Sequence, residues 1–439
     1  MLTITCENMY NYRDTNHPQI LELVWHPVPL VWNTLSSFPN LQKLTHEWRN
    51  LRTLKGIEVC PLLHELHLRG NHLRTLVGLG NCPLLRVIDC SNNRLVSLKR
   101  LDKCELLQTL NCYHNNLKTL VGLENCKQLQ TLRCPHNKLV SLAGLELCLQ
   151  LDTIDLSQNR LTVLRGIECC PQLDTLNCSW NQLVSLNGIQ YCQALRVLDL
   201  SNNCLETLDE IGDLPLLSEL NVDHNKLKSL LGLGLCPLLR KLECCFNELV
   251  IIDGLGDCLA LEELVCRNNK IVTLAGVADL DKLRILDCSS NRLDSLLQLE
   301  GCSSLRVLAC SENKIRTLDG IEGCTKLVEL YCGHNKITTL RNLEHCPHLS
   351  DIECPYNRIT SLEGIEGCKQ LRYLNCAHNR ITMLEEIVHT PKLYTLCYDS
   401  NPIAKQSSVV SKALRKIKER PLKARAKAQA NRNALVQGC

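Results

Sequence analysis

The chain has 439 residues, of which 30 are Cys and only 2 are Phe, and aromatic residues amount to 3%. Charged residues make up 22% and apolar residues 45%, which is typical of a globular protein and excludes a disordered chain. Residues 402–439 hold ten Lys and Arg against Glu419 alone, so a strongly basic segment follows a mildly acidic body.

The first 30 residues predict neither a secretory signal nor a membrane helix. They carry Glu7, Arg13, Asp14 and Glu22 and lack a long apolar run. No segment of the chain approaches the roughly 20 apolar residues that a membrane-spanning helix needs. We therefore expect an intracellular, cytoplasmic protein with reduced thiols, without a cofactor and without contact with a membrane.

Residues 1–40 precede the regular part of the sequence and are predicted to form an N-terminal cap. They do not keep the spacing of the residues that follow, although Phe38-Pro39 resembles Cys60-Pro61. Because the open end of a repeat array exposes apolar surface, we expect Trp25, Trp32 and Val24 to cover the first repeat.

A 22-residue period dominates residues 41–403. One Asn recurs in strict register, without insertion or deletion, and we call these residues the ladder asparagines. They are Asn71, Asn93, Asn115, Asn137, Asn159, Asn181, Asn203, Asn225, Asn247, Asn269, Asn291, Asn313, Asn335, Asn357, Asn379 and Asn401. One degenerate unit precedes them, in which Arg49 replaces the Asn. A fixed period of this length predicts a solenoid of about 16 units rather than several globular domains.

Each unit contains a short strand followed by turns. The spacing of Leu63, Leu66 and Leu68 indicates a strand with inward apolar side chains, and the Asn side chain is suited to bonding the backbone where the chain leaves the strand. Gly occupies the position of Gly78 in ten of fifteen units, which indicates a tight turn on the opposite side.

At LHELHLRGNHLRTL, the pattern LxxLxLxxNxLxxL resembles the leucine-rich repeat in its 22-residue form. It is similar to internalins and to the repeat-built regulatory subunit of a Ser/Thr phosphatase, in a Cys-rich variant. The resemblance implies an α/β-type solenoid, an arc or rod with a parallel sheet on the concave face and short turns or 3-10 segments on the convex face. It also implies a phosphatase-regulatory subunit as one possible function, although the C-terminal cap pattern of that subunit ends here after Asn401-Pro402-Ile403.

Two inward ladders account for 24 of the cysteines. Eleven replace the last inward Leu of the strand, as at Cys90, and thirteen stand late in the unit, as at Cys82. Leu or Val replaces Cys elsewhere in these ladders, so we interpret the thiols as buried packing residues. Disulfides between coils and metal binding at Cys-x-His pairs such as Cys112/His114 remain alternatives, whereas no single unit is marked as catalytic.

Rings gather directly before the ladder asparagines. Together with one strand tyrosine, we predict that they bind a protein partner; the set is Trp48, His114, His136, Trp180, His224, Phe246, Tyr331, His334, Tyr356 and His378. Exposed Trp, Tyr and Phe beside a concave surface are typical anchors for partners. The alternative is a solvated face that carries occasional rings.

Two charged rows follow the same period. An acidic and polar stripe runs along the outward strand positions, as at Asp89, Asn111 and Asp155. Lys or Arg follows the ladder Asn in ten of fifteen units, which could track a polyanion but is more simply interpreted as a solvated edge that is partly paired within the chain.

Residues 404–439 are predicted to form a capping helix and a basic tail. Val410, Ala413, Leu414 and Ile417 share one helical face, and Pro421 ends the helix. The basic side chains that could bind nucleic acid or an acidic assembly are Lys412, Arg415, Lys416, Lys418, Lys423, Arg425 and Lys427.

The sequence therefore predicts a non-enzymatic scaffold that binds a protein through its concave face. The alternatives are a tethering protein that binds nucleic acid or an acidic assembly through the tail, and a metal or redox role for the cysteines. The sequence leaves the oligomeric state open.

Overall fold

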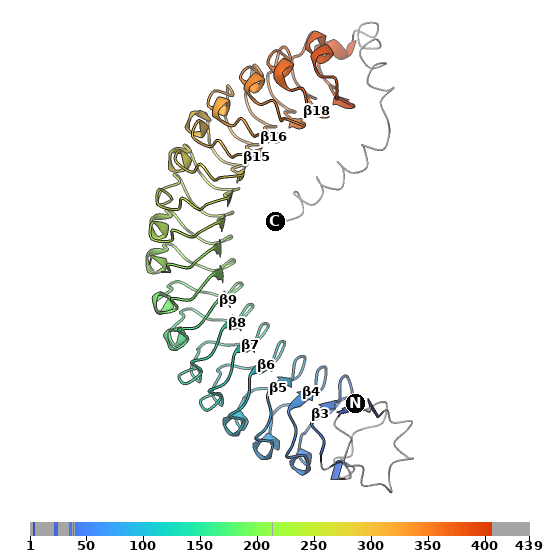
Figure 1. The fold of residues 1–439 in the computed structure, drawn as a ribbon, viewed down its shortest axis with the longest axis vertical. Coiled ribbons are helices and arrows are strands. Elements are labelled where there is room, and N and C mark those ends of the chain that lie inside the picture. Colours follow the sequence, from blue (N-terminus) through green and yellow to red (C-terminus); the bar gives the residue numbers. More distant parts are fainter. Residues whose placement is uncertain are drawn as a thin grey trace. The chain divides into compact units, whose positions relative to one another are not determined.

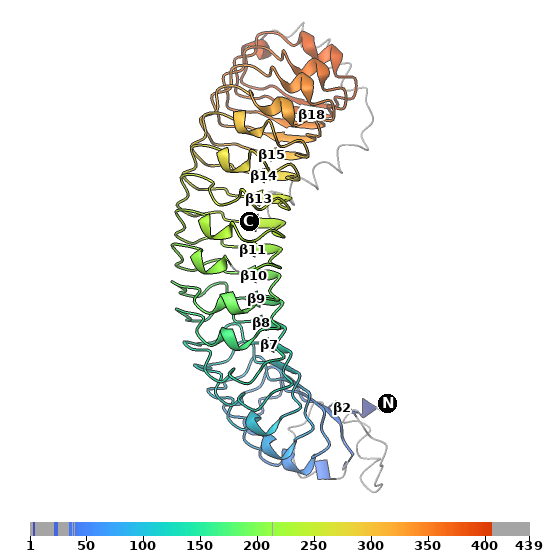
Figure 2. The ribbon, with the colours of Figure 1, turned by 60° about the vertical axis from the view of Figure 1, so that its left-hand side comes forward.

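The computed structural model describes residues 3–4, 22–24, 35–36, 38, 40–212 and 214–405. The chain divides into two compact units, the first made of Met1–Leu227 with Leu231–Leu239 and the second of Lys228–Leu230 with Arg240–Cys439. Both units are stacks of 22-residue coils, each with a three-residue strand on the inner side and, in most coils, a 3-10 turn on the outer side (Figures 1 and 2). The predicted parallel sheet and 3-10 segments are confirmed, and no α-helix occurs in the described residues.

The strands of the first unit pair in parallel with their neighbours in chain order. The strands are β1 (Thr3–Ile4), β2 (Glu22–Val24), β3 (Lys43–Thr45), β4 (Glu65–His67), β5 (Val87–Asp89), β6 (Thr109–Asn111), β7 (Thr131–Arg133), β8 (Thr153–Asp155), β9 (Thr175–Asn177), β10 (Val197–Asp199) and β11 (Glu219–Asn221). The 3-10 turns are η3 (Ile57–Val59), η4 (Leu79–Asn81), η5 (Leu101–Lys103), η6 (Ile167–Cys169), η7 (Ile189–Tyr191), η8 (Asp209–Ile211) and η9 (Leu231–Leu233). Two strands within residues 1–40 belong to this series, because β1 pairs with β2 and β2 pairs with β3.

The second unit continues the same pattern. Its parallel strands are β12 (Lys241–Glu243), β13 (Glu263–Val265), β14 (Ile285–Asp287), β15 (Val307–Ala309), β16 (Glu329–Tyr331), β17 (Asp351–Glu353), β18 (Tyr373–Asn375) and β19 (Thr395–Cys397). Its 3-10 turns are η10 (Ala275–Val277), η11 (Leu297–Leu299), η12 (Ile321–Gly323), η13 (Leu343–His345), η14 (Ile365–Gly367), η15 (Glu385–His389) and η16 (Pro402–Lys405).

The ladder asparagines join each coil to the one before it. The Oδ1 atom of Asn115 accepts a hydrogen bond from the backbone N–H of Leu95 (2.8 Å), and its Nδ2 donates to the carbonyls of Cys90 (3.0 Å) and Cys112 (3.1 Å). The same bonds recur one period later at Asn137. A buried Asn therefore satisfies backbone groups that a three-residue strand leaves open.

A left-handed turn leads into the outer 3-10 segment. Gly144 has φ 112°, and a Cβ added there would lie 2.3 Å from the carbonyl oxygen of Leu120. Its N–H donates to Glu146 Oε2 at 2.9 Å, which fixes the start of the turn. Arg100 and Asn342 adopt positive φ at the same repeat position, so in those two coils the left-handed turn forms without Gly.

Candidate functional site

The residue before each ladder Asn adopts a left-handed backbone. Over the described coils φ at this position lies between 53° and 59° in every non-glycine residue, from Trp48 to Ser400, and is 70° at Gly70. The N–H of this residue donates to the carbonyl of the following coil, as from Trp180 to Ser201 (2.9 Å) and from His378 to Asp399 (2.8 Å). Within each unit these residues form one edge of the stack, which we call the ring edge.

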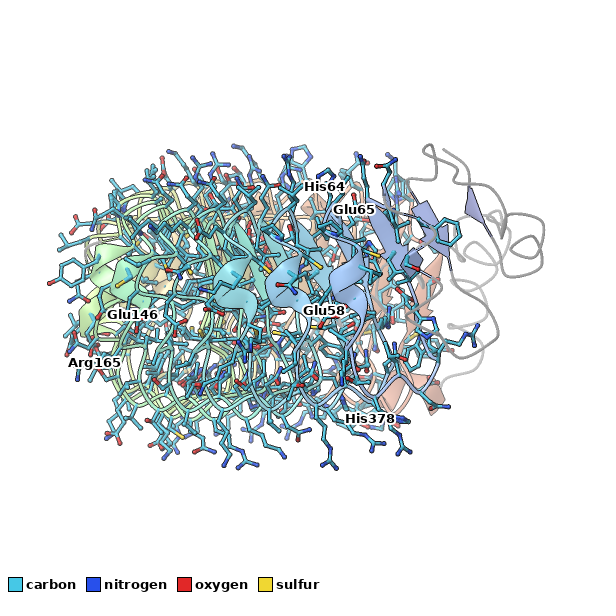
Figure 3. All side chains as sticks on the ribbon, turned by 90° about the horizontal axis from the view of Figure 1, so that it is seen from below. Glu58, His64, Glu65, Glu146, Arg165 and His378 are labelled. Carbon is cyan, nitrogen blue, oxygen red and sulfur yellow. The ribbon has the colours of Figure 1, made fainter. Side chains whose placement is uncertain are left out.

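Nine of the ten predicted partner-binding residues lie on the ring edge. They are Trp48, His114, His136, Trp180, His224, Phe246, His334, Tyr356 and His378. The exposed fractions are 59% for Trp48, 59% for Trp180, 42% for Phe246 and 48% for Tyr356. His378 likewise projects from its coil into open space (Figure 3). The tenth residue, Tyr331, lies apart from them on strand β16 and is half-buried.

In the first unit the rings make local contacts. The guanidinium of Arg69 lies 5.7 Å from the ring centroid of Trp48. A Cβ at Gly70 would meet that indole at 2.2 Å, so the ring occupies the space that the glycine leaves open. Further along, Tyr113 packs edge-on against His136, with centroids 5.1 Å apart and planes at 90°. Trp48 and His136 therefore each contact a neighbouring side chain.

In the second unit three rings form a continuous stack. His334 and Tyr356 lie 4.3 Å apart with planes at 15°, and Tyr356 and His378 lie 4.1 Å apart with planes at 7°. One face of each outer histidine remains outside the stack. The second unit thus presents an ordered aromatic strip on its ring edge.

The predicted acidic and polar stripe has a structural role that the sequence pattern did not reveal. One side-chain oxygen of Asp89 accepts a hydrogen bond from the N–H of Ser91 at 2.9 Å, and Asp155 and Asn177 bond the N–H two residues later in the same way. These Asx bonds help the chain turn out of the strand. These residues lie on the strand face, which is the face formed by the outward side chains of the strands. Besides lining that face, the stripe helps the chain to fold locally.

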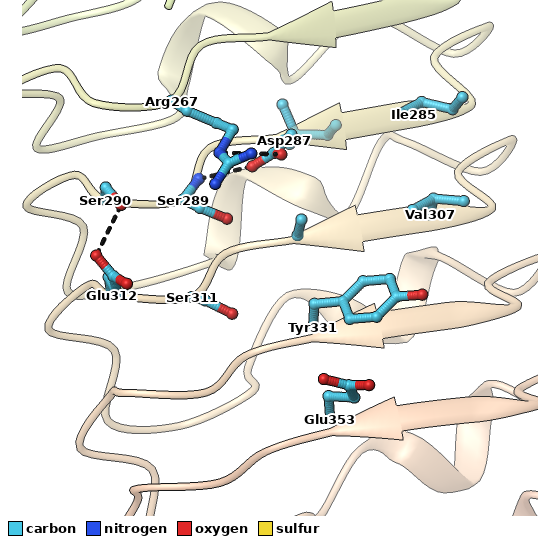
Figure 4. Close-up of a pocket in the computed structure, with 12 residues that line it drawn as sticks. Arg267, Ile285, Asp287, Ser289, Ser290, Val307, Ser311, Glu312, Tyr331 and Glu353 are labelled. Atoms are coloured by element: carbon cyan, nitrogen blue, oxygen red, sulfur yellow. Dashed lines mark hydrogen bonds and ion pairs between the residues drawn. The ribbon is translucent and has the colours of Figure 1, made fainter. Parts of the chain in front are cut away.

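A pocket of about 250 Å³ opens on the strand face of the second unit (Figure 4). Its lining residues are Arg267, Ile285, Leu286, Asp287, Ser289, Ser290, Val307, Ala309, Ser311, Glu312, Tyr331 and Glu353. The sequence pattern indicated Tyr331 as a partner-binding residue and placed Asp287 and Glu353 in the acidic and polar stripe, but it did not predict a pocket. The sequence signal for this pocket is Ala309, a small residue at a repeat position that holds the larger Asp287 and Tyr331 in the two adjacent coils.

The cations that follow the ladder asparagines are largely unpaired. Lys270 Nζ lies 3.0 Å from Glu248 Oε2. Lys336, Arg358 and Arg380 form no ion pair within the described part of the chain. The predicted pairing within the chain therefore holds at Lys270 and is not general.

The cysteine ladders are buried. Every thiol in both ladders has no exposed surface, and Cys and Leu alternate there as packing residues. In the ladder whose cysteines stand late in the unit, the thiol also donates a hydrogen bond to a carbonyl of the preceding coil. Cys126 Sγ, for example, donates to the Leu101 carbonyl oxygen at 3.4 Å. Burial raises the pKa of Cys60 to about 11, and burial followed by the charges of neighbouring groups raises that of Cys82 to about 12.

The described cysteines form no disulfide with one another, and this holds for Cys112 and Cys134, whose Sγ atoms lie 2.6 Å apart. In the Cys112/His114 pair the thiol is buried while the imidazole is exposed, so the two do not converge. Over the described residues no group of three or more His, Cys, Asp and Glu side chains is arranged to hold a metal ion. Cys169, Cys204 and Cys397 are only partly buried, and burial raises the pKa of Cys169.

Other sequence predictions lie outside the described residues. They concern the cap residues Trp25 and Trp32, the helix predicted around Val410, and the basic side chains Lys412, Arg415, Lys416, Lys418, Lys423, Arg425 and Lys427. Among the described residues no helix has the length and apolar character required to span a membrane.

Parallel coils joined by an asparagine ladder, with outer 3-10 turns, define the class of parallel-strand solenoids. A leucine-rich repeat model of two copies matches residues 303–345, and a second leucine-rich repeat model matches residues 188–227. The chain therefore contains leucine-rich repeats, and its coils have the leucine-rich repeat fold. No curated protein matches it.

Solved structures agree with this assignment. A leucine-rich repeat protein of Leptospira interrogans is 25% identical with a TM-score of 0.73, over 89% of this chain and 98% of that one. YopM of Yersinia enterocolitica is 26% identical with a TM-score of 0.68, over 90% of this chain and 81% of that one. The internalin InlF of Listeria monocytogenes shares the fold at 18% identity and a TM-score of 0.51, over 84% of this chain and 88% of that one.

Proposed function

We propose that the protein is a non-enzymatic scaffold, intracellular and cytoplasmic, that binds a protein partner through its strand face and ring edge. Solenoids of this kind present extended inner surfaces that are typical of protein–protein interaction. The use of ladder cysteines as buried packing residues in places that Leu also fills supports the reducing compartment, because such thiols need no oxidation to serve the fold.

One observation carries this proposal: Trp180, Phe246 and Tyr356 are exposed on a left-handed backbone. Such a backbone costs about 1–2 kcal/mol for most residues and is best tolerated by Gly and Asn. Gly70 and Asn202 occupy the position in other coils, so folding alone does not call for a bulky ring. Residues that oppose the local backbone preference are expected at functional positions, and Trp and Tyr are frequent binding hot spots.

The test is a pull-down with the triple variant Trp180→Ala, Phe246→Ala and Tyr356→Ala. We expect loss of the partners that the unmodified protein recovers. The matched control replaces Gln158 and Ser400 by Ala, because both occupy the same left-handed position without a ring. Unchanged recovery of every partner by the triple variant would contradict the proposal.

A second candidate function is tethering to nucleic acid or another polyanion through the basic tail. The unpaired Lys336, Arg358 and Arg380, which directly follow ladder asparagines of the second unit, favour it, because charges of one sign that lack partners attract a polyanion. The measurement is retention on heparin over a salt gradient, for the full chain and for a chain lacking residues 404–439. If retention on heparin changed neither with salt concentration nor with the deletion, this function would be excluded.

A further inference from the structure

The pocket of the second unit exists because a small residue interrupts a row of larger ones. Ala309 on β15 is in register with Asp287 on β14 and with Tyr331 on β16. Its methyl group leaves the space between these two side chains open, and Figure 4 shows the pocket there. A volume of about 250 Å³ accommodates one large side chain rather than a folded segment.

The floor of the pocket is apolar, and an aromatic ring stands beside it. Ile285 and Val307 are in register on adjacent strands and both line it. The hydroxyl of Tyr331 donates to Glu329 Oε2 at 2.7 Å, which fixes the orientation of the ring beside the cavity. An occupant therefore meets aliphatic carbon on one side and an immobilised aromatic ring on another.

The rim of the pocket is acidic. Its one lining cation, Arg267, is engaged by Asp287, with Nε and Oδ2 3.5 Å apart. Glu312 lies on the rim, where it accepts a hydrogen bond from Ser290 Oγ at 2.9 Å. Glu353 is in register with Tyr331 on the adjacent strand. Arg267 and Asp287 offset one another, so the formal charges of the lining residues, with Glu312 and Glu353 included, sum to a negative value.

We propose that this pocket receives a single Arg or Lys side chain of the protein partner. The aliphatic stem lies on Ile285, Val307 and Ala309, as the stems of long basic side chains commonly lie on apolar surface. The cationic group lies beside the ring of Tyr331 and between Glu312 and Glu353, which combines a cation–π contact with charge-assisted hydrogen bonds. An apolar occupant would desolvate these carboxylates without compensation, and an acidic one would be repelled.

This inference rests on the proposed function and specifies the partner's chemistry. It is tested by selecting a randomised phage-displayed peptide library on the immobilised full-chain protein. The pocket variants are Ala309→Asn, which fills the space with a residue that Asn177 already provides at the same repeat position, and Glu353→Gln, which removes one charge. The control is Asp199→Asn, which removes a carboxylate from the first unit at the repeat position that Glu353 occupies in the second unit.

We expect the selected peptides to share an Arg or Lys. One selected peptide should lose at least tenfold in affinity for Ala309→Asn and for Glu353→Gln and be unchanged for Asp199→Asn. Replacing its basic residue by norleucine should cause a similar loss. Peptides without a shared basic residue, or equal affinity for Ala309→Asn, would overturn the inference. So would basic peptides that bind only after removal of residues 406–439, because the chain's own basic segment would then be the occupant.

The two proposals fail in different ways. If the ring-edge triple variant keeps every partner while Ala309→Asn loses the selected peptide, the pocket inference stands and the ring edge is not the contact. If the triple variant loses its partners and Ala309→Asn keeps the peptide, the ring edge stands and the pocket inference is wrong. Circular dichroism of each variant establishes that the solenoid is intact.

Discussion

The rings of Tyr356 and His378 stack with their centroids 4.1 Å apart and their planes at 7°. Both residues occupy the left-handed position before a ladder Asn, in successive coils. The repeat therefore places the rings at nearly the separation of neighbouring strands, about 4.8 Å, which is close to the distance of stacked rings. Such a pair contributes about 0.5–1.5 kcal/mol and offsets part of the backbone cost at Tyr356.

Trp180 has no stacked ring in the described structure, so its backbone cost should be measurable. We predict that Trp180→Asn raises the free energy of unfolding by up to about 1 kcal/mol, because Asn tolerates a left-handed backbone better than Trp. The same variant should bind the partner less well. Urea denaturation and the pull-down measure the two effects. The reciprocal variant Asn202→Trp, at the same position one coil later, should lose stability; a gain would contradict the argument.

The outer turn gives a second prediction. Gly144→Ala should destabilise the first unit by at least about 2 kcal/mol, because φ is 112° and the new Cβ would lie 2.3 Å from the Leu120 carbonyl oxygen. Gly256→Ala is the matched control, because nothing lies within 4 Å of its Cβ. Thermal unfolding of the two variants side by side measures the difference. Equal melting temperatures would be incompatible with this turn geometry.

The sequence predicted those features that follow directly from the 22-residue period. Asn115 forms its ladder bonds, and Cys82 and Cys90 are buried, because residues one period apart occupy equivalent places in successive coils. The left-handed ring edge was not predicted, since rings at Trp180 and Tyr356 obscure a preference that Gly70 and Asn202 reveal.

The pocket escaped prediction for another reason. It depends on the size difference between Ala309 and the side chains on its two neighbouring strands, which a pattern within one unit does not report. The role of the acidic stripe was hidden in the same way, because Asp89 was interpreted from its exposure and not from its bond to the N–H of Ser91.

The asparagine ladder gives a third prediction. Asn115→Ala should destabilise the first unit by about 2–4 kcal/mol, because it leaves the buried Leu95 N–H without its acceptor and removes a donor from the Cys90 carbonyl. Unfolding of a repeat array is not strictly two-state. Hydrogen exchange of the Leu95 amide is therefore the appropriate measurement, and it should become much faster.

The adjacent Asn116 supplies the control for this variant. Its backbone N–H donates to the Leu95 carbonyl at 2.8 Å, a bond that an Asn116→Ala variant retains. We expect its effect on stability to stay within about 0.5 kcal/mol, as for most substitutions of partly exposed residues. If Asn115→Ala were equally mild, the ladder would not be a main source of cohesion between coils.

The cysteine ladders make stability dependent on alkaline pH. A thiol in the unfolded chain has a pKa near 8.5, whereas burial and neighbouring charges raise the pKa of Cys82 to about 12, and burial likewise raises that of Cys104 to about 12. As pH rises through about 8.5 the unfolded chain releases these protons and the folded chain retains them. Stability is therefore complete below that pH and falls as pH rises toward 12, by up to about 1.4 kcal/mol per pH unit for each such thiol.

Replacing ladder thiols by the residue that the repeat already uses isolates this effect from the titration of Lys and Tyr. Cys82→Leu and Cys104→Leu match Leu214, which is buried at the same repeat position. We expect the double variant to lose less stability between pH 8 and pH 11 than the unmodified protein, in urea denaturation followed by circular dichroism. Parallel pH profiles for the two proteins would contradict the raised thiol pKa values, because Lys and Tyr titrate equally in both.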